Sequence, residues 1–158
     1  MRNVLMVGIV LMAGVSCGAK ESPILLHCSQ ATIHGTKLRY EPEPHKQTLG
    51  FWTQVDDAAE WTFETAAPAE YDIEVLQGCG EGQGGSTMRL TCDAGEESAV
   101  PPISFTVKET GHFQAFVPCA IGRVSLAAGR HSLRIQPESI IKKACCDIRE
   151  VRLVPVLS

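Results

Sequence analysis

Residues 60–75 read EWTFETAAPAEYDIEV, and this stretch decides the fold. Apolar and polar residues alternate over residues 60–64 and again over residues 71–75, and Pro68 lies in the turn between them. A period of two is typical of a strand with one buried and one wet face, whereas an amphipathic helix repeats about every 3.6 residues. The stretch therefore predicts two strands joined by a turn.

The same alternation continues in both directions from this stretch. Further short runs of the same kind are residues 24–27, 88–92, 105–107, 113–117, 124–126, 131–135 and 148–156. Turn residues separate the runs, and no window has the apolar spacing of an amphipathic helix. About nine short strands predict an all-β fold, an antiparallel β-sandwich or jelly roll.

Length and composition favour one globular domain. The chain has 158 residues, of which 44% are hydrophobic and 20% charged, and its net charge is −4. No basic cluster is present, and a protein that holds nucleic acid by its phosphates needs one. We therefore expect no nucleic-acid partner.

Residues 1–19 have the pattern of a secretory signal peptide, with Arg2 ahead of a short apolar run and small residues up to Ala19. Cleavage near Ala19 is one alternative. The other is lipidation of Cys17, because Gly14-Val15-Ser16-Cys17 loosely matches the bacterial lipobox. Either way we expect a secreted or cell-envelope protein that meets a membrane only through an N-terminal lipid, with its folded domain at residues 24–157.

The cysteine count is consistent with an oxidising compartment. Without Cys17, six cysteines remain: Cys28, Cys79, Cys92, Cys119, Cys145 and Cys146. An even number outside the cytoplasm leads us to expect at least one disulfide, although the sequence does not select the pairs. There is no C-x-x-C pair and the histidines are scattered, so a zinc site is not expected.

Two segments, Thr36–Gly50 and Gly78–Gly85, leave the alternating pattern and should form loops. Loops at one end of a sandwich commonly carry binding residues, because the sheets hold them in place. The second loop contains G-x-G-x-x-G, but a strand pattern follows it instead of the helix that a dinucleotide site requires. Its glycines indicate either a flexible hairpin or space for a ligand.

Aromatic residues flank the long loop, and aromatic rings stack on the C–H faces of sugars. We expect a binding face built by residues 36–52, 78–85 and 111–114, where polar side chains would hold hydroxyl or sulfate oxygens. The alternative is that these side chains only fix the loop to the sandwich. The expected ligand-binding residues are Tyr40, His45, Lys46, Trp52, Gln77 and His112.

Catalytic motifs are missing. The sequence has no G-x-S-x-G elbow and no C/S-x-P-x-R sulfatase signature. Cys79 and His112 are the one candidate nucleophile pair, and a structural Cys79 is the preferred interpretation. We therefore expect that the chain is not an enzyme.

The order and spacing of the strand motifs resemble the galactose-binding-like jelly roll of carbohydrate-binding module families six and thirty-five. The motifs are A-x-I-x-G at 31–35, A-E-W-x-F at 59–63, E-Y-x-I-x-V at 70–75, V-x-L-x-x-G-x-H-x-L-x-I at 124–135 and D-I-x-x-V-x-L at 147–153. Other motifs look like a module at the C-terminus of many bacterial sulfatases. They are HGTKLRYE at 34–41, HK at 45–46, LGFW at 49–52, VLQGCG at 75–80 and TGHFQ at 110–114.

The first resemblance also implies a structural Ca²⁺, held by carboxylates of the first strand and an Asp of the last strand. Asp147 occupies the last-strand position, but Ser29 and Gln30 stand where glutamates are usual. Calcium prefers six to eight oxygen ligands with carboxylates among them, so Asp147 is a doubtful calcium ligand. No other cofactor is expected.

Together the patterns and resemblances predict an exported, non-catalytic glycan-binding module that tethers to a polysaccharide. A sulfated polysaccharide is one candidate ligand, because Lys37, Arg39 and Lys46 would supply local positive charge. A cell-surface sandwich that binds a protein partner is the alternative. A sulfatase-associated enzyme fragment is the least favoured interpretation.

Overall fold

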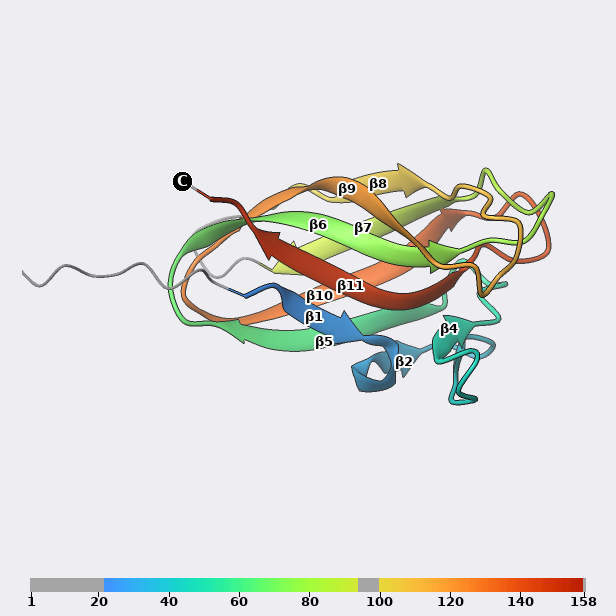
Figure 1. The fold of residues 1–158 in the computed structure, drawn as a ribbon, viewed down its shortest axis with the longest axis horizontal. Helices are drawn as coiled ribbons and strands as arrows, with labels where there is room; N and C mark the ends of the chain where they lie inside the picture. Colours follow the sequence, from blue (N-terminus) through green and yellow to red (C-terminus); the bar gives the residue numbers. More distant parts are fainter. Residues whose placement is uncertain (1–21, 94–99, 158) are drawn as a thin grey trace, which may run out of the picture.

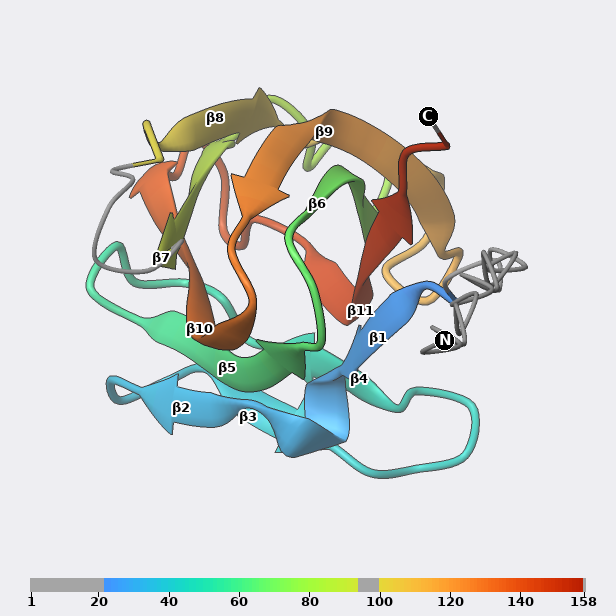
Figure 2. The ribbon, with the colours of Figure 1, turned by 90° about the vertical axis from the view of Figure 1, so that its left-hand side faces the viewer.

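A computed structural model describes residues 22–93 and 100–157, which form two antiparallel β-sheets packed face to face (Figures 1 and 2). The expected signal segment 1–19, with Cys17, lies outside the described residues. The all-β sandwich is confirmed.

The first sheet has six strands in the order β3-β4-β11-β6-β9, and β1 also pairs with β11. Its strands are β1 (Ile24–His27), β3 (Arg39–Glu41), β4 (Thr48–Gly50), β6 (Ala69–Gly78), β9 (Val117–Leu126) and β11 (Asp147–Pro155). β4 pairs with the start of β11 at Ile148, and β1 pairs with its later part. Both short strands therefore lie along one edge of β11.

The second sheet has five strands in the order β2-β5-β10-β7-β8. Its strands are β2 (Thr32–His34), β5 (Ala58–Thr65), β7 (Thr87–Asp93), β8 (Ile103–Thr106) and β10 (Gly129–Ser139). One turn of 3₁₀ helix, η1 (Cys28–Gln30), connects β1 in the first sheet to β2 in the second. No helix of the described residues is long and apolar enough to span a membrane.

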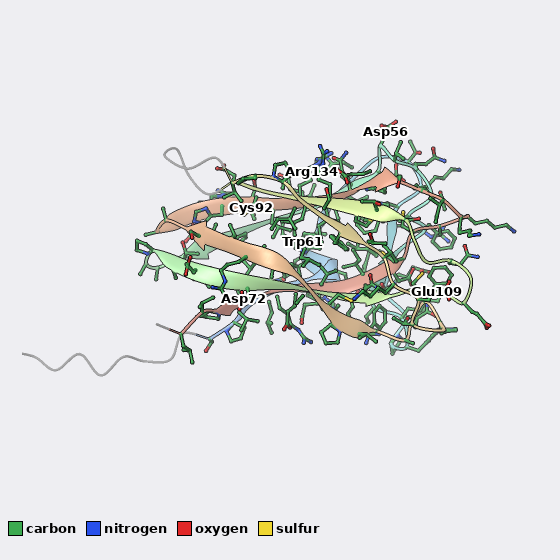
Figure 3. All side chains as sticks on the ribbon, turned by 90° about the horizontal axis from the view of Figure 1, so that it is seen from above. Asp56, Trp61, Asp72, Cys92, Glu109 and Arg134 are labelled. Carbon is green, nitrogen blue, oxygen red and sulfur yellow. The ribbon has the colours of Figure 1, made fainter. Side chains whose placement is uncertain are left out.

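The core fills the space between the sheets. In β5 and β6 the odd-numbered residues are buried, except for the partly buried Ala69, and most of the even-numbered ones are not, as the alternating sequence predicted. Trp61 lies between the sheets, while Asp72 and Arg134 lie on opposite outer faces (Figure 3). The indole nitrogen of Trp61 donates to the carbonyl of His27 over 2.8 Å, so the ring is both packed and hydrogen-bonded.

Three strands were not expected from the sequence. β2, β3 and β4 have three residues each, too few for a period of two to stand out. β3 and β4 lie within Thr36–Gly50, so that segment is a short hairpin and not one long loop. In the other direction, residues 113–116 were expected in a strand but form a loop that precedes β9.

The six cysteines of the described residues are all free thiols, so the structure contradicts the expected disulfide. Five of them are buried: Cys28, Cys79, Cys92, Cys145 and Cys146. Burial raises the pKa of Cys92 and of Cys145 to about 11. These side chains act as small apolar residues of the core.

The loops that matter for function gather at one end of the sandwich (Figure 1). The β3–β4 and β4–β5 connections meet the β8–β9 and β10–β11 connections there, and the β6–β7 loop lies beside them. The chain enters the described sandwich before β1 and leaves it after β11 at the opposite end.

Candidate functional site

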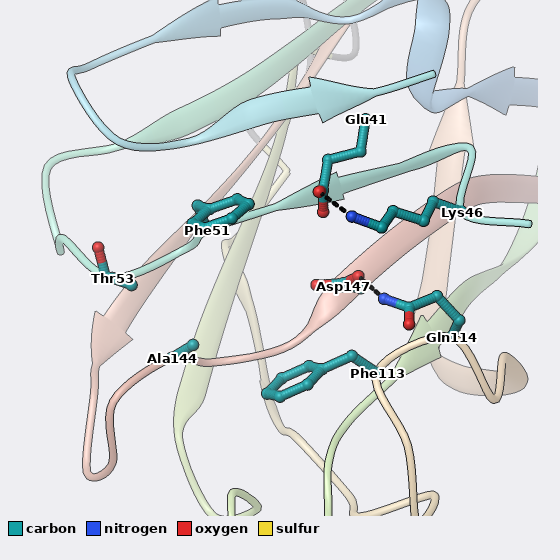
Figure 4. Close-up of a pocket in the computed structure, with 8 residues that line it drawn as sticks. All are labelled: Glu41, Lys46, Phe51, Thr53, Phe113, Gln114, Ala144 and Asp147. Atoms are coloured by element: carbon teal, nitrogen blue, oxygen red, sulfur yellow. Dashed lines mark hydrogen bonds and ion pairs between the residues drawn. The ribbon is translucent and has the colours of Figure 1, made fainter. Parts of the chain in front are cut away.

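A cavity of about 290 Å³ opens at this loop end (Figure 4). Its lining combines two aromatic rings with charged and polar groups. The lining residues are Glu41, Lys46, Phe51, Thr53, Phe113, Gln114, Ala144 and Asp147. The volume is near the lower end of the range of about 300–1,000 Å³ that is usual for small-molecule sites.

The cavity lies on the outer face of the first sheet. Leu49 of β4 and Ile148 of β11 are a register pair, and both side chains are completely buried in the core. Because side chains alternate along a strand, their neighbours Gly50 and Asp147 point to the other face. A Cβ added to Gly50 would collide with the Glu41 carboxylate and lie 3.3 Å from Oδ1 of Asp147. The missing side chain at Gly50 therefore makes room for two carboxyl groups.

A tight turn after β4 exposes the side chain of Phe51 and buries that of Trp52. Phe51 has a φ of 62°, in the left-handed region that non-glycine residues seldom adopt. The amide of Thr53 donates to the carbonyl of Phe51 over 2.9 Å, which closes the turn. Phe51 is consequently 44% exposed at the cavity, whereas Trp52 is completely buried. Unusual backbone of this kind gathers at ligand sites.

Two interactions hold this turn in place. The Trp52 indole donates to the carbonyl of Asp57 over 2.9 Å, and the amide of Cys145 donates to the carbonyl of Trp52 over 3.0 Å. On the exposed side, the Arg39 guanidinium lies 3.5 Å from the centroid of the Phe51 ring. The aromatic wall of the cavity is therefore fixed from the core and from the surface.

Asp57 anchors the chain just before the cavity. Its carboxylate accepts hydrogen bonds from the amides of Thr36, Lys37 and Leu38, at 2.7 to 3.0 Å. Burial opposes the charge, but the three donors outweigh it, so the pKa of Asp57 is lowered. Gly35 has a φ of 117°, and a Cβ there would collide with the Asp57 carboxylate. The sequence therefore needs glycine at this turn.

Arg149 positions the loop that carries Lys46. A bulge in β11 between Ile148 and Glu150 frees Arg149 from the regular pairing. Its guanidinium donates to the carbonyls of Lys46 at 2.6 Å and Gln47 at 3.3 Å, and lies 3.9 Å from the ring centroid of Phe116. The loop is thus tied to the strand that supplies Asp147.

Lys46 and Glu41 form an ion pair at 2.7 Å on the cavity wall. The Glu41 side chain is 11% exposed and the Lys46 side chain 30% exposed. The hydrogen bond that Lys46 donates to Glu41 raises the pKa of Lys46, so the ammonium stays charged. The positive charge of Lys46 is therefore already paired with a carboxylate of the protein.

Asp147 is the second carboxyl of the cavity and is 5% exposed. Its Oδ2 accepts a hydrogen bond from the Gln114 amide over 2.9 Å. Burial raises the pKa of Asp147 to about 7, and Glu41 adds to the rise, whereas Gln114 and Lys46 oppose it. A carboxyl with this pKa changes its charge near neutral pH.

Glycines at the end of β6 and in the β6–β7 loop leave room for the β8–β9 loop, which carries Phe113. A Cβ on Gly78 would collide with the carbonyl of Phe113, and one on Gly80 would lie 2.8 Å from the Phe113 ring. Gly80 also forms an isolated bridge with Gly111. These glycines therefore let Phe113 and Gln114 lie close over the end of β6, where they close the cavity.

Only one of the expected ligand-binding residues, Lys46, lines the cavity. Tyr40 is partly buried against the core, and Gln77 is completely buried, where its amide donates to the carbonyl of Lys108 over 2.7 Å. His45 is exposed in the β3–β4 loop.

The remaining two expected residues, His112 and Trp52, act on the cavity from outside its lining. His112 is exposed, and its Nδ1 accepts from the amide of Gln114 over 3.1 Å, which shapes the turn that presents Gln114. Trp52 has no exposed ring face to offer a sugar. Its position matches the alternative that we stated for it, a side chain that fixes the loop.

The sequence patterns did not point to most of the residues that line the cavity. These are Glu41, Phe51, Thr53, Phe113, Gln114 and Ala144. A usable signal was present at Phe51-Trp52, where two adjacent aromatics follow Gly50 and only one can face the core. Gln77 was expected to bind a ligand, but strand alternation extended from Ile73 and Val75 would have placed it inward, as the structure does.

The residues do not fit the calcium site that the resemblance implied. Ser29 and Gln30 are exposed in η1, and their side-chain oxygens are engaged by His27 at 2.8 and 3.2 Å. Beside Asp147 there is one further carboxylate, Glu41, which is paired with Lys46. Within residues 22–93 and 100–157, no group of three or more His, Cys, Asp or Glu could hold a metal ion.

The fold is similar to those of solved carbohydrate-binding modules. A family 35 carbohydrate-binding module from Clostridium thermocellum superposes with a TM-score of 0.65 and 15% identity, over 86% of this chain and 100% of that one. The C-terminal family 6 module of the laminarinase LamC from Zobellia galactanivorans gives a TM-score of 0.65 at 14% identity, covering 84% and 99%. A family 35 module of Abf62 from Cellvibrio japonicus gives 0.65 at 13% identity, covering 84% and 93%.

Sequence comparison adds nothing to this result. No family model matches the chain, and no curated protein matches it in sequence. The structural similarity shows that the fold is the jelly roll of the carbohydrate-binding modules. The resemblance to the sulfatase-associated module is not shown by these comparisons.

Proposed function

We propose that this protein is a non-catalytic glycan-binding module whose ligand occupies the loop-end cavity. The observation that carries the proposal is the pairing of two aromatic rings, Phe51 and Phe113, with buried polar groups in one cavity of a carbohydrate-binding-module jelly roll. Aromatic faces bind the C–H surface of a sugar, and carboxylate and amide groups bind its hydroxyls. The volume suits one sugar ring with its substituents.

Export and tethering to a polysaccharide are part of the same proposal, and they rest on the signal-peptide pattern of residues 1–19. A sulfated ligand is less suited to this particular cavity. Lys46 is the one positive charge among the described lining residues, and Glu41 already pairs with it. A sulfate would meet the Asp147 carboxyl without a free cation to offset it.

Binding to gel-embedded and insoluble polysaccharides tests the proposal. We expect retention of the wild-type protein on at least one polysaccharide. Phe51→Ala should weaken that retention by about 1–3 kcal/mol, by analogy with the stacking of bases on aromatic side chains. Leu25→Ala, an exposed apolar residue of β1 outside the cavity, is the matched control and should bind like the wild type.

Melting temperatures of both variants separate lost contacts from lost folding. If Phe51→Ala retains full binding while remaining folded, the ligand does not use this cavity. If no polysaccharide retains the wild-type protein, the proposed function is wrong and the protein-binding sandwich becomes the better interpretation.

The two carboxyls of the cavity raise the question of glycoside hydrolysis, which uses a pair of them on opposite sides of the scissile bond. Glu41 and Asp147 instead both lie next to Gly50, on the same wall of the cavity. Glu41 is also ion-paired with Lys46. We therefore expect no turnover of glycosides or aryl sulfates. Hydrolysis by the pure protein that Asp147→Asn abolishes would show that the protein is an enzyme.

A further inference from the structure

One carboxylate oxygen of the cavity, Oδ1 of Asp147, is open to a ligand. Asp147 is 95% buried, since its exposed fraction is 5%, and its Oδ2 is held by Gln114. Oδ1 is turned away from Gln114, toward the side of the cavity where Phe51 and Phe113 lie (Figure 4). It is not one of the buried polar atoms of the described residues that lack a partner, so it is open to the cavity, where a ligand that supplies a charged donor can bind to it.

The charge balance of the cavity indicates which donor fits. Its lining has two carboxyls, Glu41 and Asp147, and one ammonium, Lys46, which is bound to Glu41 at 2.7 Å. Arg39 stacks on Phe51 but is not part of the lining. The groups facing Asp147 from the packed elements are Glu41, Lys46 and the neutral Gln114, with the thiols of Cys79 and Cys146 behind it. A ligand with one positive charge would balance the ionised Asp147.

An ammonium group suits these surroundings better than a metal ion. The NH2 group of Gln114 and the Lys46 ammonium adjoin the two carboxyls, and these nitrogen donors cannot coordinate a metal as a ligand oxygen would. The Arg39 guanidinium already covers one face of Phe51, so the other face of that ring and the Phe113 ring remain to attract an organic cation. The same rings would contact the carbon skeleton that carries the ammonium group.

We propose that the cavity selects a sugar with a free, protonated amino group, whose ammonium donates to Oδ1 of Asp147 while its ring lies between Phe51 and Phe113. This inference rests on the proposed glycan-binding function and names the ligand class of that site. A hydroxyl of a neutral sugar can donate to the same oxygen but leaves the charge unbalanced. A uronic acid or a sulfate ester adds a third negative charge.

Paired oligosaccharides test the inference. Glucosamine oligomers and the same oligomers after full N-acetylation have the same rings and differ in the positive charge. We expect the free-amine oligomer to bind the wild-type protein about tenfold more tightly, measured by titration calorimetry at neutral pH, where about half of Asp147 is ionised, because charge-assisted hydrogen bonds are the stronger ones. Asp147→Asn should reduce this preference to less than about twofold. Asp72→Asn, which removes an exposed carboxylate of the outer face of β6, should leave it intact.

The outcomes separate this inference from the proposed function. If the N-acetylated oligomer binds as tightly as the free amine, or if folded Asp147→Asn keeps the preference, the amino-sugar assignment is wrong although glycan binding stands. Tighter binding of an oligouronate, or of a lysine-containing peptide, also overturns it. If no oligosaccharide of any charge binds, both the inference and the proposed function fail.

Discussion

Asp147→Asn is expected to stabilise the protein, and by more at alkaline than at acidic pH. The pKa of Asp147 rises from an ordinary 3.8 to about 7 in the folded state. Each pKa unit corresponds to about 1.36 kcal/mol, so ionising the buried carboxyl costs the folded state about 4 kcal/mol at most. Asparagine has nearly the same shape, and its oxygen can still accept from Gln114, but it carries no charge.

The sign of the pH dependence follows from proton uptake. Between about pH 4 and pH 7 the folded chain holds a proton on Asp147 that the unfolded chain has lost, so this group makes stability fall as the pH rises. Of this cost of ionising Asp147, roughly 2–3 kcal/mol of folding stability is lost between pH 5 and pH 8. That loss corresponds to a fall of roughly 5–10 °C in melting temperature for a chain of this size. The asparagine variant lacks this slope.

Thermal unfolding of wild type and variant, followed by circular dichroism over this pH range, measures the effect. The relevant quantity is the difference between the two proteins, because pH effects that are common to both cancel in it. Asp72→Asn, at an exposed carboxylate paired with Arg123, is the control and should show no comparable slope. A difference between wild type and Asp147→Asn that stays constant from pH 5 to pH 8 would refute the reasoning.

Three further predictions concern the loops that build the cavity. Phe51→Gly should be about 1 kcal/mol more stable than Phe51→Ala in urea unfolding, because only glycine adopts a φ of 62° without strain; equal stabilities would count against strain at this turn. Trp52→Ala should cost roughly 3–5 kcal/mol of folding stability, since a fully buried ring is lost, and a small loss would mean that the loop repacks. Asp57→Asn should lose roughly 1–3 kcal/mol at neutral pH. This difference should vanish in acid as the lowered pKa of Asp57 is passed, so a loss that persists at pH 2 would contradict the anchoring role.

The alternating pattern predicted the sandwich because the long strands each keep one face in the core. β5, β6 and β7 show nearly perfect alternation of burial, and the sequence already placed their centres correctly. The three-residue strands β2, β3 and β4 could not be found in this way. They pair because neighbouring long strands hold them, and such support from distant residues leaves no local period.

The candidate site was harder to predict than the fold. The sequence indicated the end of the sandwich at which the cavity lies, and two of the three expected segments supply lining residues. Trp52 was expected to stack on a sugar because it flanks the long loop, whereas a backbone turn with positive φ exposes Phe51 instead. Asp147 was noticed only as a metal ligand, because its relation to Glu41 depends on Gly50 in a strand that the pattern did not reveal.

The separation between the cavity and the two ends of the described chain has a practical consequence. Residues near 22 and 157 lie at the end of the sandwich away from the cavity, and β10 alone, with 11 residues, spans roughly 35 Å of that length. A fluorophore, a biotin or a second domain joined next to residue 22 or residue 157 would therefore stand clear of a ligand as long as several sugar units. Surface immobilisation at either of these two positions should leave the cavity facing the solution, so the affinities measured that way can be compared directly with those measured free in solution.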